Sequence, residues 1–181
     1  MEQAILTILS PGFEEVEAIT AIDILRRARL NVTTAALSAI DVEGSHGITV
    51  RAEHRLADID TTQFDMLVLP GGMRGVENML ADSRLMEIAD QMAARGCRMA
   101  AVCAAPLIYD TLGLLEGRRF TCHPCIYDRL KSNGVQNVPT ITDGMFTTGR
   151  SAGCAMAWAI EMVRATLGSV PESMLNGLCQ P

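Results

Sequence analysis

Short apolar runs alternate with segments of helical spacing along almost the whole chain, and this alternation limits the possible folds most strongly. Residues 4–9 and 66–69 are runs suited to buried strands, and each ends at a turn rich in Pro and Gly. Residues 14–29 instead place apolar side chains three positions apart, as on one face of a helix. This order predicts an α/β fold: a doubly wound, mostly parallel sheet with helices on both faces.

The remaining predicted elements continue the alternation. Further strands are expected at residues 31–37 and 98–102, with weaker ones at 118–122, 139–142 and 145–148. Helices are expected at 83–95, 104–114, 152–167 and 171–178, and residues 42–52 read as an antiparallel excursion. The sequence contains no repeat, low-complexity tract or linker, so we expect a single domain over residues 1–181.

Charge and hydropathy argue against two classes of partner. The net charge of −6 and the pI near 5.0 disfavour nucleic acid, because phosphate binding needs a basic patch. No apolar run approaches the roughly 20 residues that a membrane span needs. The N-terminal residues lack the basic region of a signal peptide, so we expect a cytoplasmic protein.

One of the six cysteines has a distinctive setting. A disulfide framework is not needed in a core-rich chain of 181 residues, so most cysteines are expected to be buried thiols. Cys103, however, lies between an apolar strand and a predicted helix, with the small residues Ala101 and Ala105 two positions away on either side. A nucleophile elbow requires this pattern, and free N–H groups of a helix N-terminus favour a thiolate. A buried cysteine in an alanine-rich strand fits this segment equally well.

An acidic segment, residues 14–17, is expected at the same edge of the sheet. Glu14 and Glu15 read as solvated acids of a first helical turn, whereas Glu17 can turn inward. A carboxyl buried against the Cys103 sulfur would have a raised pKa and could hold or exchange a proton. The alternative is a third acid that only complements the helix dipole.

Two glycines follow the neighbouring strand. Gly71 and Gly72 let the backbone approach a ligand closely, and their N–H groups with that of Ala104 could form an oxyanion pocket. A Pro-Gly-Gly turn without such a role is also common.

Four motifs together resemble the ThiJ/PfpI family, most closely its parkinsonism-associated deglycase branch. They are residues 12–17, 69–72, 101–106 and 123–124, in the family's order and spacing, and the likeness covers essentially the whole chain. The resemblance implies a flavodoxin-like fold and a homodimer. It also implies Cys103 as an oxidation-sensitive nucleophile, Glu17 as a protonated acid on its sulfur, and His123 as a nearby acid or base.

The activities implied by the resemblance are enzymatic and protective. Members of the branch are described as glyoxalases that convert methylglyoxal to lactate without a cofactor, and as deglycases of proteins or nucleotides. They are also described as redox-responsive chaperones in oxidative stress, so a non-enzymatic sensor that uses Cys103 remains the alternative. A thiamine-pathway enzyme lacks support, since the chain has no phosphate-binding motif.

The sequence departs from the family pattern near the predicted site. His46 stands where relatives often carry Arg, and Ala152 stands where they carry Pro, which makes His46 and Arg150 candidate substrate contacts. Ala104 stands where the proteolytic branch of the family has a His directly after the cysteine, so the motif does not support peptidase activity.

Cys122 and Cys125 form a CxxC around His123. A dedicated redox or zinc role is not favoured, because the motif lacks the expected helix start and further ligand spacing. We expect no metal site. A disulfide from Cys103 to Cys122 or Cys125 under oxidative stress is the more plausible use of these thiols.

Overall fold

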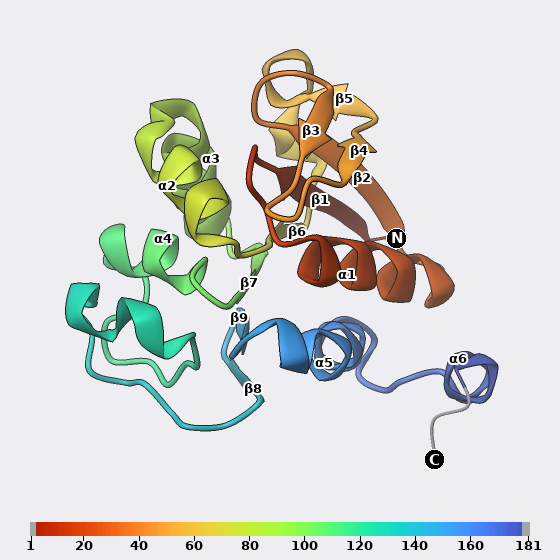
Figure 1. The fold of residues 1–181 in the computed structure, drawn as a ribbon. Coiled ribbons are helices and arrows are strands. Elements are labelled where there is room, and N and C mark those ends of the chain that lie inside the picture. The colour runs from red at the N-terminus through yellow and green to blue at the C-terminus, as the bar shows by residue number, and fades with distance from the viewer. Residues whose placement is uncertain (1–2, 179–181) are drawn as a thin grey trace.

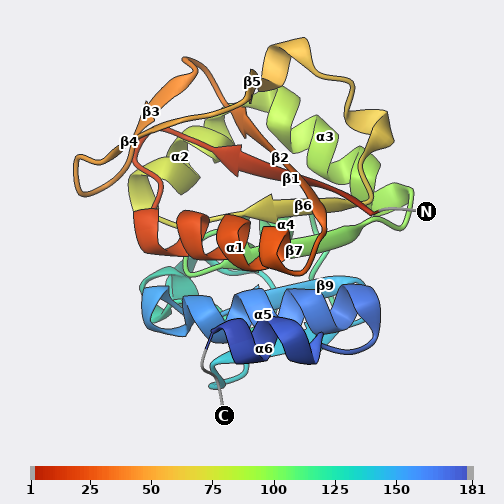
Figure 2. The same cartoon turned by 90° about the vertical axis from the view of Figure 1, so that its right-hand side faces the viewer.

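A seven-stranded sheet forms the centre of the computed structural model, which describes residues 3–178 (Figures 1 and 2). Its strand order is β5-β2-β1-β6-β7-β9-β8, and all neighbours are parallel except the antiparallel pair β8 and β9. The strands are β1 (Ala4–Leu9), β2 (Asn31–Ala36), β5 (His54–Arg55), β6 (Met66–Leu69), β7 (Arg98–Val102), β8 (Thr140–Asp143) and β9 (Phe146–Gly149).

Helices cover both faces of this sheet (Figure 1). One face carries α1 (Glu15–Arg27), α5 (Ala155–Leu167) and α6 (Glu172–Gly177); the other carries α2 (Met73–Ala81), α3 (Ser83–Ala94) and α4 (Pro106–Thr111). In β1, Ile5 and Leu9 join the core under α1, whereas Leu6 and Ile8 join the opposite core. Burial on both faces explains why the strands are continuous apolar runs rather than alternating ones. The predicted fold class and single domain are confirmed.

The antiparallel excursion is also confirmed. It is a hairpin of β3 (Asp41–Glu43) and β4 (Thr49–Arg51), which pair as a separate two-stranded sheet. Short 3₁₀ turns complete the chain: η1 (Leu56–Asp58), η2 (Thr61–Gln63), η3 (Pro124–Arg129) and η4 (Ala152–Cys154). No helix within residues 3–178 combines the length and apolarity needed to cross a bilayer.

Two predicted elements need correction, and one helix was not predicted. Residues 118–122 form no strand, because their pairing is limited to a single bridge between Phe120 and Val135. The helix after Cys103 begins at Pro106 and ends at Thr111, which makes it shorter than the predicted 104–114. Helix α2 was not predicted, since its buried face contains only Gly75, Val76 and Met79 and gives little periodic signal.

Candidate active site

Three turns meet at the carboxyl edge of the sheet and enclose a cavity of about 300 Å³. The turn after β7 contributes Cys103 and Ala104, the turn after β6 contributes Gly72, and the start of α1 contributes Glu14 and Glu17. His123, from the segment before η3, completes this part of the wall. The parallel sheet therefore brings together residues that lie far apart in the sequence.

Cys103 lies in a left-handed backbone conformation, with φ of 61°. This region is unfavourable for a residue with a Cβ, and such strain is common at functional sites. The turn is fixed from both sides: the Cys103 N–H donates to the Gly149 carbonyl at 3.0 Å, and its carbonyl accepts from the His123 N–H at 2.8 Å. Ala101 and Ala105 are fully buried beside it, as the crowding at an elbow requires.

Glu17 turns inward and has no exposed surface. Its Oε2 accepts the Gly71 N–H at 2.7 Å, and its Oε1 is buried without a hydrogen-bond partner within the described chain. The carboxyl lies beside the Cys103 side chain, since both are within 2.7 Å of the position that a Cβ on Gly71 would take. Burial raises the pKa of Glu17 to about 7, although the Gly71 N–H and the Cys103 thiol act in the opposite direction, and the charge of Glu14 adds to the rise. A carboxyl with this pKa can exchange a proton with the thiol near neutral pH.

Burial also raises the pKa of the Cys103 thiol, and the neighbouring Glu17 raises it further. The backbone N–H groups of Ala104 and Gly72 point at the sulfur and act in the opposite direction, but they do not outweigh burial. The predicted readily ionised thiol is therefore wrong for this structure: α4 starts at Pro106, has only six residues, and does not compensate for desolvation. Ionisation of Cys103 needs a nearby base, and Glu17 is in contact with it.

The two glycines differ in what their N–H groups bind, and only Gly72 keeps the predicted role. The Gly71 N–H donates to Glu17 and is not free to bind an oxyanion, whereas the Gly72 N–H faces the sulfur. A Cβ on Gly71 would lie 2.6 Å from Glu17 Oε2 and 2.7 Å from Cys103 Cβ. A glycine at this position is thus a steric requirement for the contact between the carboxyl and the thiol.

His123 is among the residues that line the cavity. Its Nδ1 accepts the Cys125 N–H at 3.1 Å, so the neutral ring carries its proton on Nε2. In the part of the chain from residue 3 to 178, no carboxylate is hydrogen-bonded to this ring. His123 can therefore donate a proton from Nε2 without the acid of a catalytic triad.

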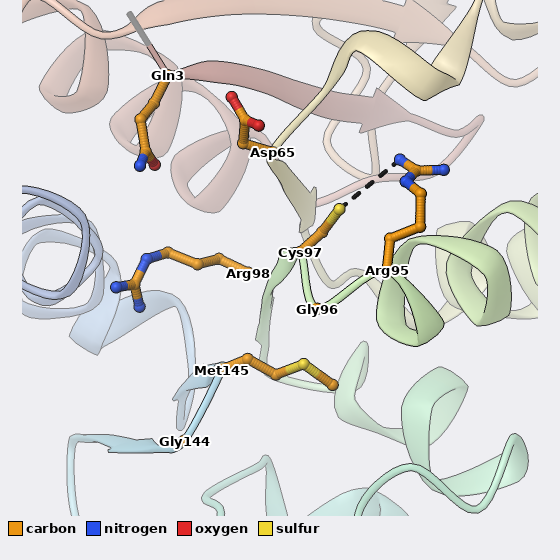
Figure 3. Close-up of a pocket in the computed structure, with 8 residues that line it drawn as sticks. All are labelled: Gln3, Asp65, Arg95, Gly96, Cys97, Arg98, Gly144 and Met145. Carbon is orange, nitrogen blue, oxygen red and sulfur yellow. Dashed lines mark hydrogen bonds between the residues drawn. The ribbon is translucent and has the colours of Figure 1, made fainter. Parts of the chain in front are cut away.

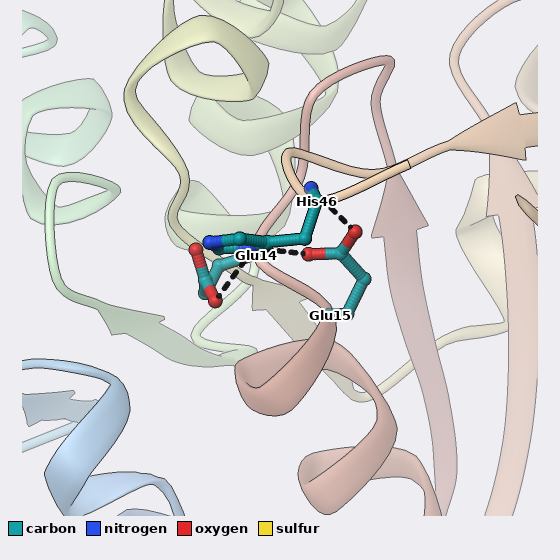
Figure 4. Close-up of side chains that lie close together, drawn as sticks. All are labelled: Glu14, Glu15 and His46. Carbon is teal, nitrogen blue, oxygen red and sulfur yellow. Dashed lines mark hydrogen bonds and ion pairs between the residues drawn. The ribbon is translucent and has the colours of Figure 1, made fainter. Parts of the chain in front are cut away.

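Glu15 is not solvated, contrary to the prediction. Its Oε1 accepts the His46 N–H at 2.7 Å, and its Oε2 lies 3.0 Å from His46 Nδ1 and 3.1 Å from Ser45 Oγ (Figure 4). Burial opposes ionisation, but these hydrogen bonds outweigh it and lower the pKa of Glu15 to about 2. Glu15 thus anchors the turn of the β3–β4 hairpin to the start of α1.

Neither of the candidate substrate contacts, His46 and Arg150, lines this chain's cavity. For His46 the resemblance implies a contact with the site of a partner subunit, and this stays a prediction. His46 lies beside Glu14 and Glu15, and ligand atoms of these three residues lie within 4.8 Å of one another. The hairpin anchoring explains this cluster without a metal ion. The Arg150 guanidinium donates to Asn137 Oδ1, while Ser151 and Ala152 form the wall of the cavity near it.

A larger hollow, of about 460 Å³, lies at the opposite edge of the sheet (Figure 3). It contains a second thiol, Cys97, with Asp65, Arg95 and Arg98. The Cys97 thiol donates to the Phe64 carbonyl at 3.5 Å and lies 3.6 Å from an Arg95 nitrogen. Within the described chain, the partners of this sulfur are a backbone carbonyl and Arg95 rather than a buried carboxyl.

Comparison with known proteins assigns the chain to a family. The model of the DJ-1/PfpI family matches residues 3–165, which is most of the chain. The chain belongs to the DJ-1/PfpI family. The crystal structure of Drosophila melanogaster DJ-1beta superposes with a TM-score of 0.94 at 30% identity, covering 100% of both chains. The fold is therefore flavodoxin-like, as the resemblance implied.

Curated relatives in the DJ-1/PfpI family share about a third of their residues with this chain. Protein DJ-1 homolog A of Arabidopsis thaliana is 33% identical over 91% of this chain, and protein dj-1beta of Drosophila melanogaster is 33% identical over 93% of it. A deglycase of Pyrococcus abyssi is 32% identical over 88% of the chain and 97% of its own length. The chain matches 91% of dj-1beta but only 42% of the Arabidopsis protein, and so spans less than half the length of that relative.

Proposed function

We propose that this protein is a cysteine-dependent deglycase or glyoxalase, which acts without a cofactor on reactive carbonyls such as methylglyoxal or on their protein adducts. The observation that carries the proposal is the contact of the Cys103 thiol with a buried carboxyl, Glu17, whose pKa is about 7. Relatives named as deglycases support a role of this type.

The first step of the proposed reaction is addition of the thiol to the aldehyde carbon. Glu17 takes the proton of Cys103 while the C–S bond forms, and the aldehyde oxygen becomes an alkoxide. N–H groups of Gly72 and Ala104, which lie beside the sulfur, are placed to stabilise that charge. Glu17 then returns the proton to the alkoxide, which gives a hemithioacetal and leaves Glu17 ionised for the next stage.

The second stage converts the hemithioacetal of methylglyoxal to lactate. The proton on the former aldehyde carbon moves to the neighbouring carbon, with Glu17 as base and His123 Nε2 protonating the ketone oxygen, and an acyl thioester results. Water then hydrolyses this thioester, which releases lactate and regenerates the thiol. The overall reaction consumes one water and needs no external oxidant or reductant.

Two further parts of the proposal concern assembly and context. Val16 and Ile19 on α1 and Ile48 in the hairpin turn are large exposed apolar residues. They support a homodimer in which this face packs against a second copy, and sedimentation of the wild type should then give the mass of two chains. The protective role in oxidative stress rests on the family resemblance.

Turnover of methylglyoxal by paired cysteine variants tests the proposed function. Cys103→Ala should reduce kcat/KM by more than about 1000-fold, because no other thiol in the cavity contacts Glu17. The matched control is Cys97→Ala, at the other end of the same strand, which should stay within about twofold of the wild type.

Full activity in Cys103→Ala would contradict the mechanism. Absence of turnover in the wild type, together with selective oxidation of Cys103 by low doses of peroxide, would instead favour the sensor or chaperone alternative.

A further inference from the structure

The CxxC motif around His123 has no part in the proposed carbonyl chemistry, yet one of its thiols opens into the reactive cavity. Cys125 lines the same 300 Å³ cavity as Cys103 and is exposed to solvent. Cys122 has no exposed surface and does not line this cavity. The structure therefore distinguishes the two thiols that the sequence left as equal candidates for pairing with Cys103.

The backbone holds the two segments together through His123. The His123 N–H donates to the Cys103 carbonyl at 2.8 Å, and the His123 Nδ1 accepts the Cys125 N–H at 3.1 Å. The first hydrogen bond connects the turn after β7 to the residue before η3, and the second caps the start of η3. Cys125 is the second residue of η3, and its exposed side chain lines the same cavity as Cys103.

We propose that Cys125 is a resolving cysteine for Cys103, so that oxidation by a hydroperoxide ends in a reversible disulfide between these two residues. The proposal concerns a reaction with hydroperoxides and does not depend on carbonyl turnover.

The proposed sequence has two balanced steps. In the first, Glu17 takes the thiol proton, the Cys103 sulfur attacks a hydroperoxide and the O–O bond breaks, so that the sulfur becomes a sulfenic acid and the other oxygen takes the proton from Glu17 and leaves as an alcohol or water. In the second, the Cys125 sulfur attacks the sulfenyl sulfur, the S–S bond forms, and the hydroxyl leaves as water with the thiol proton. Two equivalents of an external thiol, such as glutathione, then reduce the disulfide and are themselves oxidised.

The surroundings of Cys103 favour the sulfenic acid long enough for this second step. The N–H groups of Gly72 and Ala104 and the carboxyl of Glu17 all contact the sulfur, and they can hydrogen-bond an added oxygen. Cys122 cannot compete, because it has no exposed surface and does not line the cavity into which the Cys103 sulfur opens.

Mass spectrometry after treatment with one equivalent of hydrogen peroxide tests the proposal on wild type, Cys125→Ser and Cys122→Ser. The wild type should lose the mass of two hydrogen atoms, contain a linked pair of peptides that include Cys103 and Cys125, and recover on addition of glutathione. Cys122→Ser should behave like the wild type. Cys125→Ser should form at least about tenfold more Cys103 sulfinic acid, which glutathione does not reverse.

Three outcomes would overturn the proposal. They are a disulfide that links Cys103 to Cys122, a disulfide between Cys122 and Cys125, and an equal yield of sulfinic acid in wild type and Cys125→Ser. Since Cys125 is exposed, its replacement by Ser should leave the melting temperature unchanged, and circular dichroism can verify the fold of each variant.

Discussion

The two ends of β7 present the same functional group in different settings. Cys97 lies one residue before the strand, at the edge of the larger hollow, and Cys103 lies one residue after it. The first thiol is hydrogen-bonded to a backbone carbonyl and lies near Arg95. The second has a strained backbone, a protonatable carboxyl and two N–H groups directed at its sulfur.

This difference shows that the size of a hollow is a poor guide to chemistry here. The hollow at Cys97 is larger, but two of its charged groups are bound to the backbone: Asp65 accepts the Ala4 N–H, and Arg95 donates to the carbonyls of Thr61 and Phe64. At the carboxyl edge, turns that follow parallel strands direct N–H groups to one point. A proton acceptor within contact of the thiol makes that smaller cavity the reactive one.

The largest expected difference in turnover comes from replacing the carboxyl near each of the two thiols. Glu17→Gln keeps an acceptor for the Gly71 N–H but cannot take the thiol proton, so methylglyoxal turnover should fall by about 100- to 10 000-fold. Asp65→Asn, the equivalent change at the Cys97 hollow, should stay within about twofold. Equal losses in the two variants would show that the carboxyl at Cys103 has no special role.

The pH dependence of stability gives the next largest effect. Because the pKa of Glu17 is about 7 in the folded protein and 4.5 in its ordinary state, native Glu17 retains a proton that the unfolded chain has released between these values. The free energy of unfolding of the wild type, relative to Glu17→Gln, should therefore fall by about 3 kcal/mol between pH 4.5 and pH 8. Urea titrations of both proteins across this range measure the difference, and a constant difference would contradict a buried carboxyl.

Replacing a glycine near each end of β7 should give a smaller difference, in the free energy of unfolding and in turnover. Gly71→Ala forces a Cβ into Glu17 and Cys103, so it should lower the free energy of unfolding by about 1–3 kcal/mol and also reduce turnover. Gly96, next to Cys97, has φ of 77° and open space around its Cβ position. Gly96→Ala should cost about 1 kcal/mol from backbone strain alone and leave turnover unchanged. A loss of turnover in Gly96→Ala would contradict the conclusion that only the cavity at Cys103 is reactive.

Much of this architecture could be predicted because it depends on local patterns. The strands before Pro11, Pro70 and Cys103 are continuous apolar runs with distinct ends, and the strand-end rule then places the following turns at one edge. The inward orientation of Glu17 was expected from the family resemblance, because the strand-end rule alone left an acid that only complements the helix dipole as the alternative. The hairpin was predictable because Gly44 and Gly47 interrupt its alternating segments.

The features that were missed depend on contacts between distant residues. Glu15 looks like an exposed first-turn acid, and its burial results from donors about 30 residues away in the hairpin turn. The pairing of Arg150 with Asn137 and the use of the Gly71 N–H by Glu17 also have no local signal. The balance between desolvation and N–H groups at Cys103 could not be predicted, since it depends on how deeply the sulfur lies.

The left-handed backbone of Cys103 has a consequence for anyone who evolves this protein in the laboratory. Glycine would adopt φ of 61° without the penalty of roughly 1 kcal/mol that a side chain incurs there. A library screened only for heat resistance would therefore enrich Cys103→Gly, a variant that lacks both the backbone strain and the reactive thiol. Screens for robust versions of this protein should score survival and chemistry in the same round.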